Sequence, residues 1–283
     1  MIEFFQALWQ PENAFLRRVL LGGVLGGVAC GVMGSYVVSR RITSIAGGVS
    51  HSALGGIGIA AYLMVTRGWQ WLNPLYGAVA AAILSALIIG VVSVRARQRE
   101  DTIISAVWAV GMAVGILFIQ KTPGYAVDLM SYLFGSIGLF SWPDIWVMAI
   151  TDAVILCVVF VFWKPLLAVC FDSEFARLRG IRAERYYLLL LCLTALTVVS
   201  LLRVMGTVLL IALLALPAAA AGHFTKTLWQ MMVWGVVCSI VLTVIGLAMS
   251  YSLGLPPGAT IALAAGAFYL VTAAAARLAS RGR

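Results

Sequence analysis

The sequence predicts an all-α, polytopic membrane helical bundle with eight or nine transmembrane helices. Of its 283 residues, 63% are hydrophobic and 10% are charged, whereas a soluble domain carries about 25% charged residues. Apolar segments recur along the whole chain, and the longest hydrophilic stretch, residues 171–185, is about the length of one short helix with turns. We therefore expect residues 1–283 to form a single transmembrane domain.

Nine apolar segments are candidates for the spans, since a helix that crosses the bilayer needs about 20 residues. They cover residues 19–38, 52–66, 74–94, 103–119, 142–163, 186–202, 205–221, 228–253 and 259–276. The second is short unless it begins in the glycine-rich stretch before it or is a broken helix that lines a cavity. Residues 186–202 and 205–221 are either two spans or a span and a re-entrant helix, which leaves the side of the N-terminus open.

Glycines in the first span indicate close helix packing. They stand at positions 22, 23, 26, 27 and 31 and form overlapping GxxxG pairs. Small residues at this spacing let the backbone of another helix approach closely. Gly111 and Gly115 repeat the pattern in the fourth span. Asp101-Thr102 is predicted to cap that span at its start.

The basic side chains indicate orientation in the membrane. The net charge is +9, and most Lys and Arg residues fall in short segments between spans, where they mark the cytoplasmic side. Two spans separate the two main clusters, so both lie on one face. The clusters are Arg95, Arg97 and Arg99, then Lys164, Arg177, Arg179, Arg182 and Arg185. Arg277, Arg281 and Arg283 predict a cytoplasmic C-terminus, and no nucleic-acid partner is expected.

No motif for nucleotide or resident metal binding occurs in the chain. There is no GxxxxGK[ST] sequence, which excludes ATP binding by that route, and no HExxH pair for an intramembrane enzyme. The five cysteines are scattered, without a CxxC spacing, and are expected to be buried apolar side chains. If the protein moves a substrate with chemical energy, a partner must supply that energy.

His51 is the first candidate site residue. It is one of only two histidines and lies at the mouth of an apolar segment, within RRITSIAGGVSHSALGGIGIAAYLM. Ionisable side chains within a membrane are costly and are functional candidates for that reason. No carboxylate lies one helical turn away. His51 is therefore either a structural histidine, hydrogen-bonded among packed helices, or a transient ligand for a divalent transition ion.

Asp152 is the second candidate site residue. It lies about eight residues inside the span over 142–163, and a carboxylate at that depth is expected to face a cavity or a partner. Asp144 lies on roughly the same face, nearer the end of the span. For Asp144 a helix cap after Pro143 and an ion contact are both open interpretations. Residues 125–143 are predicted to form an interfacial or re-entrant connector that contains Asp128.

Two segments on the predicted cytoplasmic side are candidates for partner docking. In the first, Glu174, Ala176 and Gly180 have the spacing E-x-A-x-x-x-G, which suits a short helix with an exposed small face, ended by Gly180. A solvated charged loop is the alternative. In the second, His223 and Lys226 follow a small-residue run that begins at Pro217. We interpret His223 as a structural or docking residue.

Six segments in this order resemble the membrane permease subunits of the zinc and manganese ABC import family. They are RRITSIAGGVSHSALGG, Glu100-Asp101-Thr102, DLMSYLFGSI from Asp128, FDSEFARLRG from Phe171, RVMGTVLLIALLALPAAAA to Ala221 and LGLPPGATIALAAG. The resemblance implies a homodimer of permeases in a bacterial inner membrane, a dimer of separate cytoplasmic ATPase subunits, and an extracytoplasmic metal-binding protein. The docking surface would be residues 218–229, helped by the loop that contains Glu174. The siderophore and cobalamin permeases have a related fold and similar end motifs.

The resemblance implies that His51 and Asp152 line a pathway for a divalent metal, which is transported as substrate, with ATP held by the partner and no cofactor on this chain. The family pattern has an aspartate four residues before the histidine, where this chain has Gly47. It also has a proline where this chain has Gly55. Asp152 or another acid would then replace the missing ligand, or the ion is held by fewer ligands. Alternatives are a permease for a metal chelate and a secondary carrier with Asp152 as its proton relay.

Overall fold

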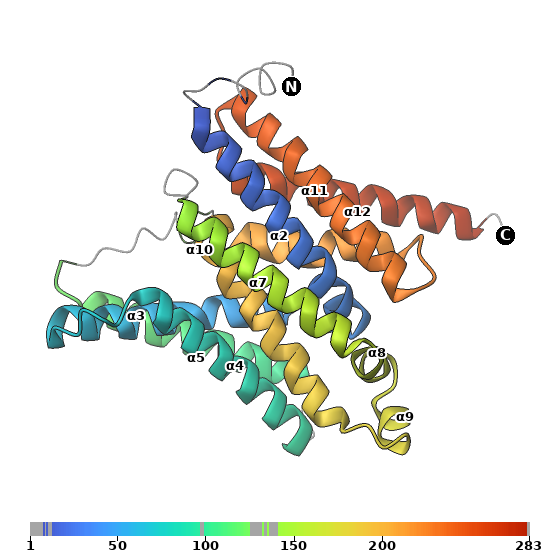
Figure 1. The fold of residues 1–283 in the computed structure, drawn as a ribbon, viewed down its shortest axis with the longest axis horizontal. Coiled ribbons are helices and arrows are strands. Elements are labelled where there is room, and N and C mark those ends of the chain that lie inside the picture. The colour runs from blue at the N-terminus through green and yellow to red at the C-terminus, as the bar shows by residue number, and fades with distance from the viewer. Residues whose placement is uncertain are drawn as a thin grey trace. The chain divides into compact units, whose positions relative to one another are not determined.

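The computed structural model describes residues 8, 10, 13–96, 99–124, 132, 135 and 141–281, and the regular elements in them are helical. The helices are α2 (Ala14–Ser39), α3 (Ile45–Arg67), α4 (Pro74–Ala96), α5 (Glu100–Lys121), α7 (Trp142–Val161), α8 (Trp163–Phe171), α9 (Ser173–Leu178), α10 (Ala183–Gly222), α11 (Leu228–Leu253) and α12 (Pro257–Arg281) (Figure 1). The connector predicted over 125–143, with Asp128, lies mostly outside the described residues.

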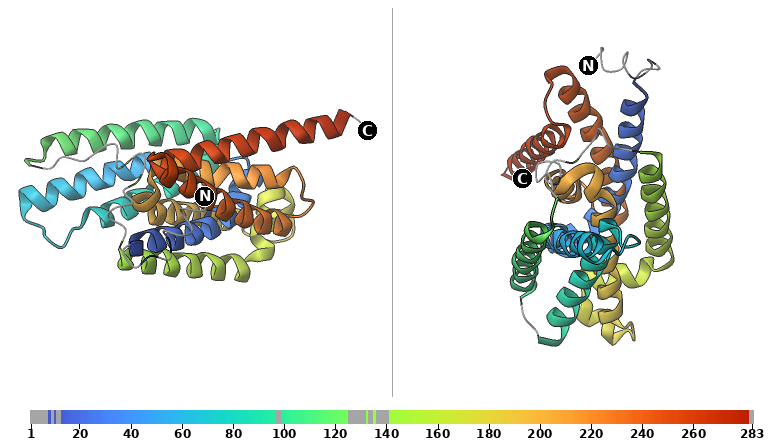
Figure 2. Two further views of the ribbon diagram at one scale, coloured as in Figure 1. Left: turned by 90° about the horizontal axis from the view of Figure 1, so that it is seen from above. Right: turned by 90° about the vertical axis from the view of Figure 1, so that its left-hand side faces the viewer.

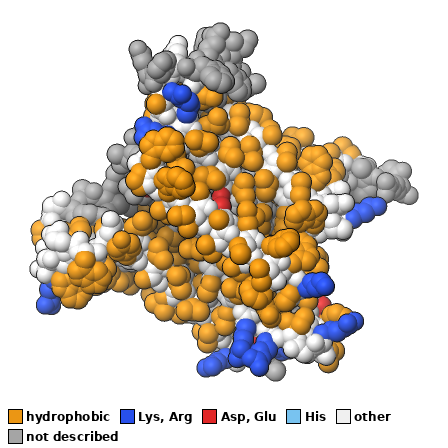
Figure 3. Space-filling view, in the orientation of Figure 1, with side chains coloured by type: hydrophobic (Ala, Val, Ile, Leu, Met, Phe, Trp, Pro, Cys, Tyr) orange, Lys and Arg blue, Asp and Glu red, His pale blue; other side chains and the backbone are white. Residues whose placement is uncertain are grey.

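Within the described residues, nine helical segments are long and apolar enough to cross a membrane. This confirms the predicted all-α membrane bundle. The face in Figure 3 is covered mainly by hydrophobic side chains, with Lys and Arg in small groups at its edges. The second span begins at Ile45 and has 23 residues, so it is a full-length helix that starts in the glycine-rich stretch.

The two segments predicted over 186–202 and 205–221 form one element, α10, that is broken at Gly206. Gly206 has φ 73° and ψ 169°, in the left-handed half of backbone space that glycine adopts without steric cost. The segments on either side, Ala183–Leu202 and Val204–Gly222, are each long enough to be a span. The two candidate spans therefore follow one another without a loop, and the break at Gly206 lies near the start of the second.

The chain forms two compact units. The first contains Met1–Arg41, Met130–Phe160 and Ser200–Arg283, and the second contains Ile42–Leu129 and Val161–Val199. The first thus holds α2, α7, α11, α12 and the second half of α10. The second holds α3, α4, α5, α8, α9 and the first half of α10. A single permease domain over the whole chain stays a prediction.

In the second unit α3 packs against both α4 and α5 (Figures 1 and 2). Close packing depends on glycine, because a Cβ atom at Gly55 would lie 2.7 Å from the carbonyl oxygen of Gly111. One turn further on, a Cβ atom at Gly58 would lie 2.6 Å from the Gly115 oxygen. These distances are shorter than a van der Waals contact. The predicted packing role of Gly111 and Gly115 is confirmed.

In the first unit the glycines of α2 pack against α11 (Figure 2). A Cβ atom at Gly27 would lie 2.9 Å from a side-chain carbon of Ile240, and one at Gly31 would lie 2.5 Å from the Cα atom of Val236. The backbones are in direct contact, as overlapping GxxxG pairs allow. This confirms the prediction made from the glycine spacing of the first span.

The start of α5 differs from the sequence prediction, whereas the start of α7 agrees with one of the two interpretations of Asp144. The N-cap of α5 is Arg99, with no side-chain cap, and Asp101 instead accepts a hydrogen bond of 2.9 Å from the Ser44 hydroxyl. The predicted capping role of Asp101 is therefore wrong, because α5 starts at Glu100, three residues before the predicted start at Ile103. At α7, Asp144 accepts hydrogen bonds from the Ser141 backbone N–H and hydroxyl, which satisfies a free donor at the helix start.

Candidate functional site

His51 projects from α3 in the second unit and is half-buried. Its ring stacks on Trp108 of α5, with ring centroids 4.9 Å apart and an angle of 9° between the ring planes. Its Nδ1 atom is buried and has no hydrogen-bond partner among the described residues. The structural interpretation required a hydrogen-bonded histidine. Instead, stacking on Trp108 holds the ring, and its buried Nδ1 atom keeps an unused lone pair or N–H.

The glycines around His51 explain how the two rings meet. Gly48 packs against Ile104 and Gly55 against Gly111, so that α3 and α5 touch along their length. A side chain between these helices would separate the rings by several ångströms. Trp108 was not identified from the sequence, because an aromatic residue in an apolar span is an ordinary lipid-facing residue. Gly55, where the family pattern has proline, belongs to this contact.

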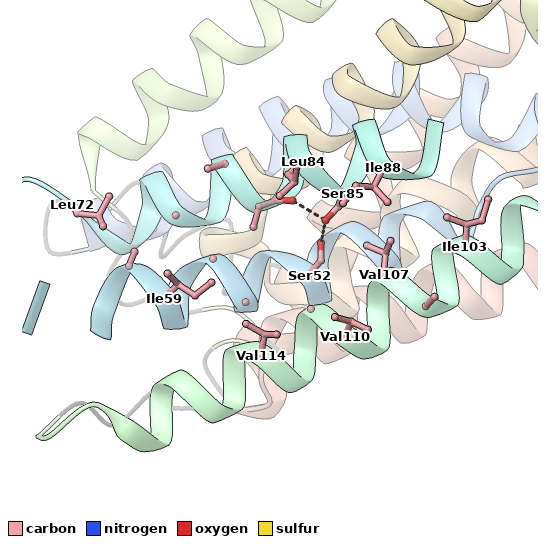
Figure 4. A pocket seen from close by; sticks show the side chains of 18 residues that line it. Ser52, Ile59, Leu72, Leu84, Ser85, Ile88, Ile103, Val107, Val110 and Val114 are labelled. Atoms are coloured by element: carbon pink, nitrogen blue, oxygen red, sulfur yellow. Dashed lines mark hydrogen bonds between the residues drawn. The ribbon is translucent and has the colours of Figure 1, made fainter. Parts of the chain in front are cut away.

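A serine pair fixes α3 against α4 next to His51. The Ser85 hydroxyl donates a hydrogen bond of 2.7 Å to Ser52 Oγ (Figure 4). Ser52 in turn donates one of 2.9 Å to the Val49 carbonyl. Both serines are buried. Paired hydroxyls add directional contacts between membrane helices that otherwise meet through apolar and small residues. Helix α3 is therefore held on one side by Ser85 and on the other by Trp108.

Asp152 lies on α7 in the first unit, and only 5% of its surface is exposed. Neither carboxylate oxygen has a hydrogen-bond partner in the part of the chain that the structure describes. A buried polar group without a partner is costly, and a charge more so. The buried hydroxyls of Thr207 and Ser239 in the same unit also lack partners there. Such a carboxylate has its full capacity to bind a cation or a proton.

His51 and Asp152 belong to different compact units, and the structure describes each within its own unit. Among the described residues no three His, Cys, Asp or Glu side chains gather in a cluster that could hold a metal ion. Asp144 is engaged with Ser141, which favours the cap over the ion contact that the sequence left open. Its neighbour Asp152 is the carboxylate of α7 that stays available.

The first docking candidate, α9, is a well-capped short helix. Asp172 accepts hydrogen bonds from the backbone N–H groups of Glu174 and Phe175, and Gly180 follows the helix end with φ 79°. The predicted end at Gly180 is thus confirmed. The predicted exposed small face is wrong, because Ala176 is fully buried. The exposed side chains are large: Leu178 is 88% exposed.

The second docking candidate is the turn between α10 and α11. Pro217 lies inside the last turns of α10, and His223 and Lys226 are exposed beyond its end. The His223 ring lies 6.1 Å from the ring of Tyr269 on α12. Phe224, whose role the sequence did not single out, is 65% exposed. The turn therefore presents an aromatic ring beside a histidine and a lysine.

Comparison with known proteins places these features in a family context. The chain matches the model of the ABC 3 transport family over residues 12–276. It is 40% identical, over 274 residues, to an uncharacterised membrane protein of Synechocystis, with 97% of this chain and 94% of the relative covered. It is 31% identical over 268 residues to the manganese transport system membrane protein MntC of Listeria monocytogenes, with 95% and 92% covered.

Among solved structures, the chain is similar to one in PsaBC from Streptococcus pneumoniae in complex with Fab. The TM-score is 0.81 at 28% sequence identity, and the match covers 96% of this chain and 95% of the other. The likeness thus extends over the complete fold, including both compact units.

Proposed function

The chain belongs to the ABC 3 transport family and is a multi-pass membrane permease of the zinc and manganese import type, and on this basis we propose how it transports its ion. The substrate is a manganese or zinc ion. A separate ATPase drives alternating access of a permease homodimer in a bacterial cytoplasmic membrane, and an extracytoplasmic binding protein delivers the ion. Manganese is favoured by the relatives, since the Listeria protein is a manganese transport component.

The observation that carries the proposal is the state of His51. An imidazole with a free, buried Nδ1 atom, held by an aromatic ring, is preorganised for a ligand. Neutral imidazole suits divalent transition ions. Because Gly47 supplies no carboxylate on the same helical face, His51 alone would bind weakly. Weak binding fits transport, since an ion held by a full ligand set would leave slowly.

Asp152 is proposed as the second group of the pathway. Its uncompensated carboxylate would attract a divalent cation, and ionisable residues at membrane depth mark ion pathways. His51 and Asp152 are thus proposed as two separate groups of the pathway, each described within its own unit.

The docking role is proposed for the turn between α10 and α11, with α9 as a second contact. The support is chemical: an exposed Phe224 beside His223 and Lys226 gives an apolar anchor with a basic rim. Buried aromatic anchors dominate many protein interfaces. Glu174 and Gly180 would shape α9. The exposed leucine and phenylalanine of this helix would contact the ATPase, and the buried Ala176 would support the helix on its inner face.

The proposed function predicts metal-stimulated ATP hydrolysis. The chain would be purified with the ATPase and the binding protein from the same source, reconstituted in vesicles, and assayed with manganese, zinc, iron and cobalt. We expect manganese or zinc to stimulate hydrolysis and uptake together. Uptake that requires no ATP and stops when the ion gradient is dissipated would instead identify a secondary carrier.

Replacement of Phe224 by aspartate tests the docking turn. We expect the amount of co-purified ATPase to fall by roughly tenfold or more, as for loss of an aromatic anchor. The control is Trp71→Asp, which places the same charge at another exposed aromatic position, in the segment between α3 and α4. Equal ATPase recovery from Phe224→Asp and wild type would exclude Phe224 as an anchor.

A further inference from the structure

A cavity of about 630 Å³ lies in the second unit between α3, α4 and α5 (Figure 4). Its lining is almost entirely aliphatic, with leucine, isoleucine and valine side chains above a floor of alanine and glycine. The polar side chains in the lining are Ser52 and Ser85, and they are hydrogen-bonded to one another. The cavity therefore has no group left for an ion and suits an apolar occupant.

The cavity is accessible from the outer surface of the unit. Leu84 on α4 is 58% exposed and Val110 on α5 is 64% exposed, and both line it. These helices are candidate spans, so their outer surface lies at the level of the hydrocarbon chains. Glycines make the cavity deep. Gly55, Gly56 and Gly77 let three helices approach closely, and they have no side chains to fill the space between the helices.

Two arginine side chains follow the lining residues at one end of the cavity. Arg95 follows the lining residue Ile88 by seven positions on α4, and Arg99 precedes the lining residue Ile103 by four positions at the start of α5. The seven-residue spacing keeps Arg95 on the same face of α4 as Ile88, and Arg99 is the N-cap residue of α5, one turn before Ile103. Both arginines are exposed, and neither forms an ion pair among the residues that the structure describes.

The nearby acidic residues form no ion pair with either arginine among the described residues. Glu100 accepts a hydrogen bond from the Ser93 hydroxyl, and Asp101 accepts one from the Ser44 hydroxyl. Both acids are thus turned toward hydroxyl groups of their own unit. An apolar cavity at acyl-chain depth, continued by two unpaired arginines, complements a molecule with an apolar tail and an anionic head.

We propose that this cavity is a binding site for an anionic phospholipid. One acyl chain occupies the aliphatic cavity, and the phosphate lies between Arg95 and Arg99. Basic residues beside grooves between membrane helices bind anionic head groups. A helix from a second copy of the chain would fill the same space, but it would not require the two arginines. The site is independent of the metal pathway and of the partner ATPase.

Native mass spectrometry of the full purified chain in mild detergent tests the site, with phosphatidylglycerol and phosphatidylcholine of identical acyl chains as probes. We expect the wild type to retain phosphatidylglycerol in roughly fivefold or greater preference. Arg95→Gln with Arg99→Gln should bring the preference close to one. Lys121→Gln, at the other end of α5, removes one charge as a control and should leave the preference unchanged.

A second pair of variants tests the cavity itself. Ala106 lines the cavity and is exposed, whereas Ala109 on the same helix is exposed but outside the lining. Ala106→Phe should reduce retention of both lipids severalfold, and Ala109→Phe should not. The proposal is overturned if the arginine variants keep the wild-type preference. It is also overturned if Ala106→Phe retains both lipids like wild type, or if its only effect is to dissociate a dimer, which would assign the cavity to a second copy.

Discussion

Replacing His51 with alanine is expected to lower metal uptake by roughly 100-fold or more, the scale of effect seen when a metal ligand or its support is lost. The imidazole has a buried nitrogen without a hydrogen-bond partner among the described residues, and alanine leaves no ligand there. Uptake of manganese and zinc into vesicles that contain the complete transporter would measure the loss. Recovery of the permease with its ATPase should be unchanged, because His51 lies within α3 and far along the chain from the docking turn.

Trp108 provides the matched comparison for His51. Trp108→Ala removes the stacked ring and should reduce uptake severalfold, while Trp108→Phe keeps an aromatic face and should restore most of it. Aromatic contacts of this kind contribute about 0.5–1.5 kcal/mol, so the thermal unfolding midpoint should shift only slightly in either variant. Wild-type uptake by an assembled His51→Ala transporter would remove His51 from the pathway.

The fold was predictable from composition and from glycine spacing. An apolar chain with few charges has no stable alternative to membrane spans. The GxxxG pairs of α2 and the pair at Gly111 and Gly115 then identified which faces pack. Small residues at this spacing have few other uses in a membrane helix, so the pattern carries information about the contact even without a partner sequence.

The surroundings of the site were not predictable, because they depend on residues from different helices. Nothing in the spacing of His51 and Trp108 along the chain indicates that their rings stack. The burial of Ala176 is a similar case: alanine is compatible with an exposed or a buried face, and neighbouring elements decide which. Asp101 shows a third cause: α5 starts three residues earlier than predicted, so Asp101 lies inside the helix and contacts Ser44 instead of capping the helix.

Replacing Asp152 with leucine is expected to reduce transport without reducing the stability of the fold. Asp152→Leu replaces an unpartnered buried carboxylate by an apolar side chain of similar size, which removes the cost of burying a polar group without a hydrogen bond. The unfolding midpoint of the variant in detergent should therefore equal or exceed that of the wild type. Uptake should fall by roughly tenfold or more, as expected for an ionisable residue of an ion pathway.

Asp144 is the matched control, because it is the other aspartate of α7 and has the opposite role. Its carboxylate holds the start of the helix through Ser141, and loss of such a cap costs about 0.5–2 kcal/mol. Asp144→Ala should therefore lower the unfolding midpoint and leave uptake close to wild type. If Asp152→Leu instead lowers stability and uptake together, then Asp152 supports the fold and is not a group of the ion pathway.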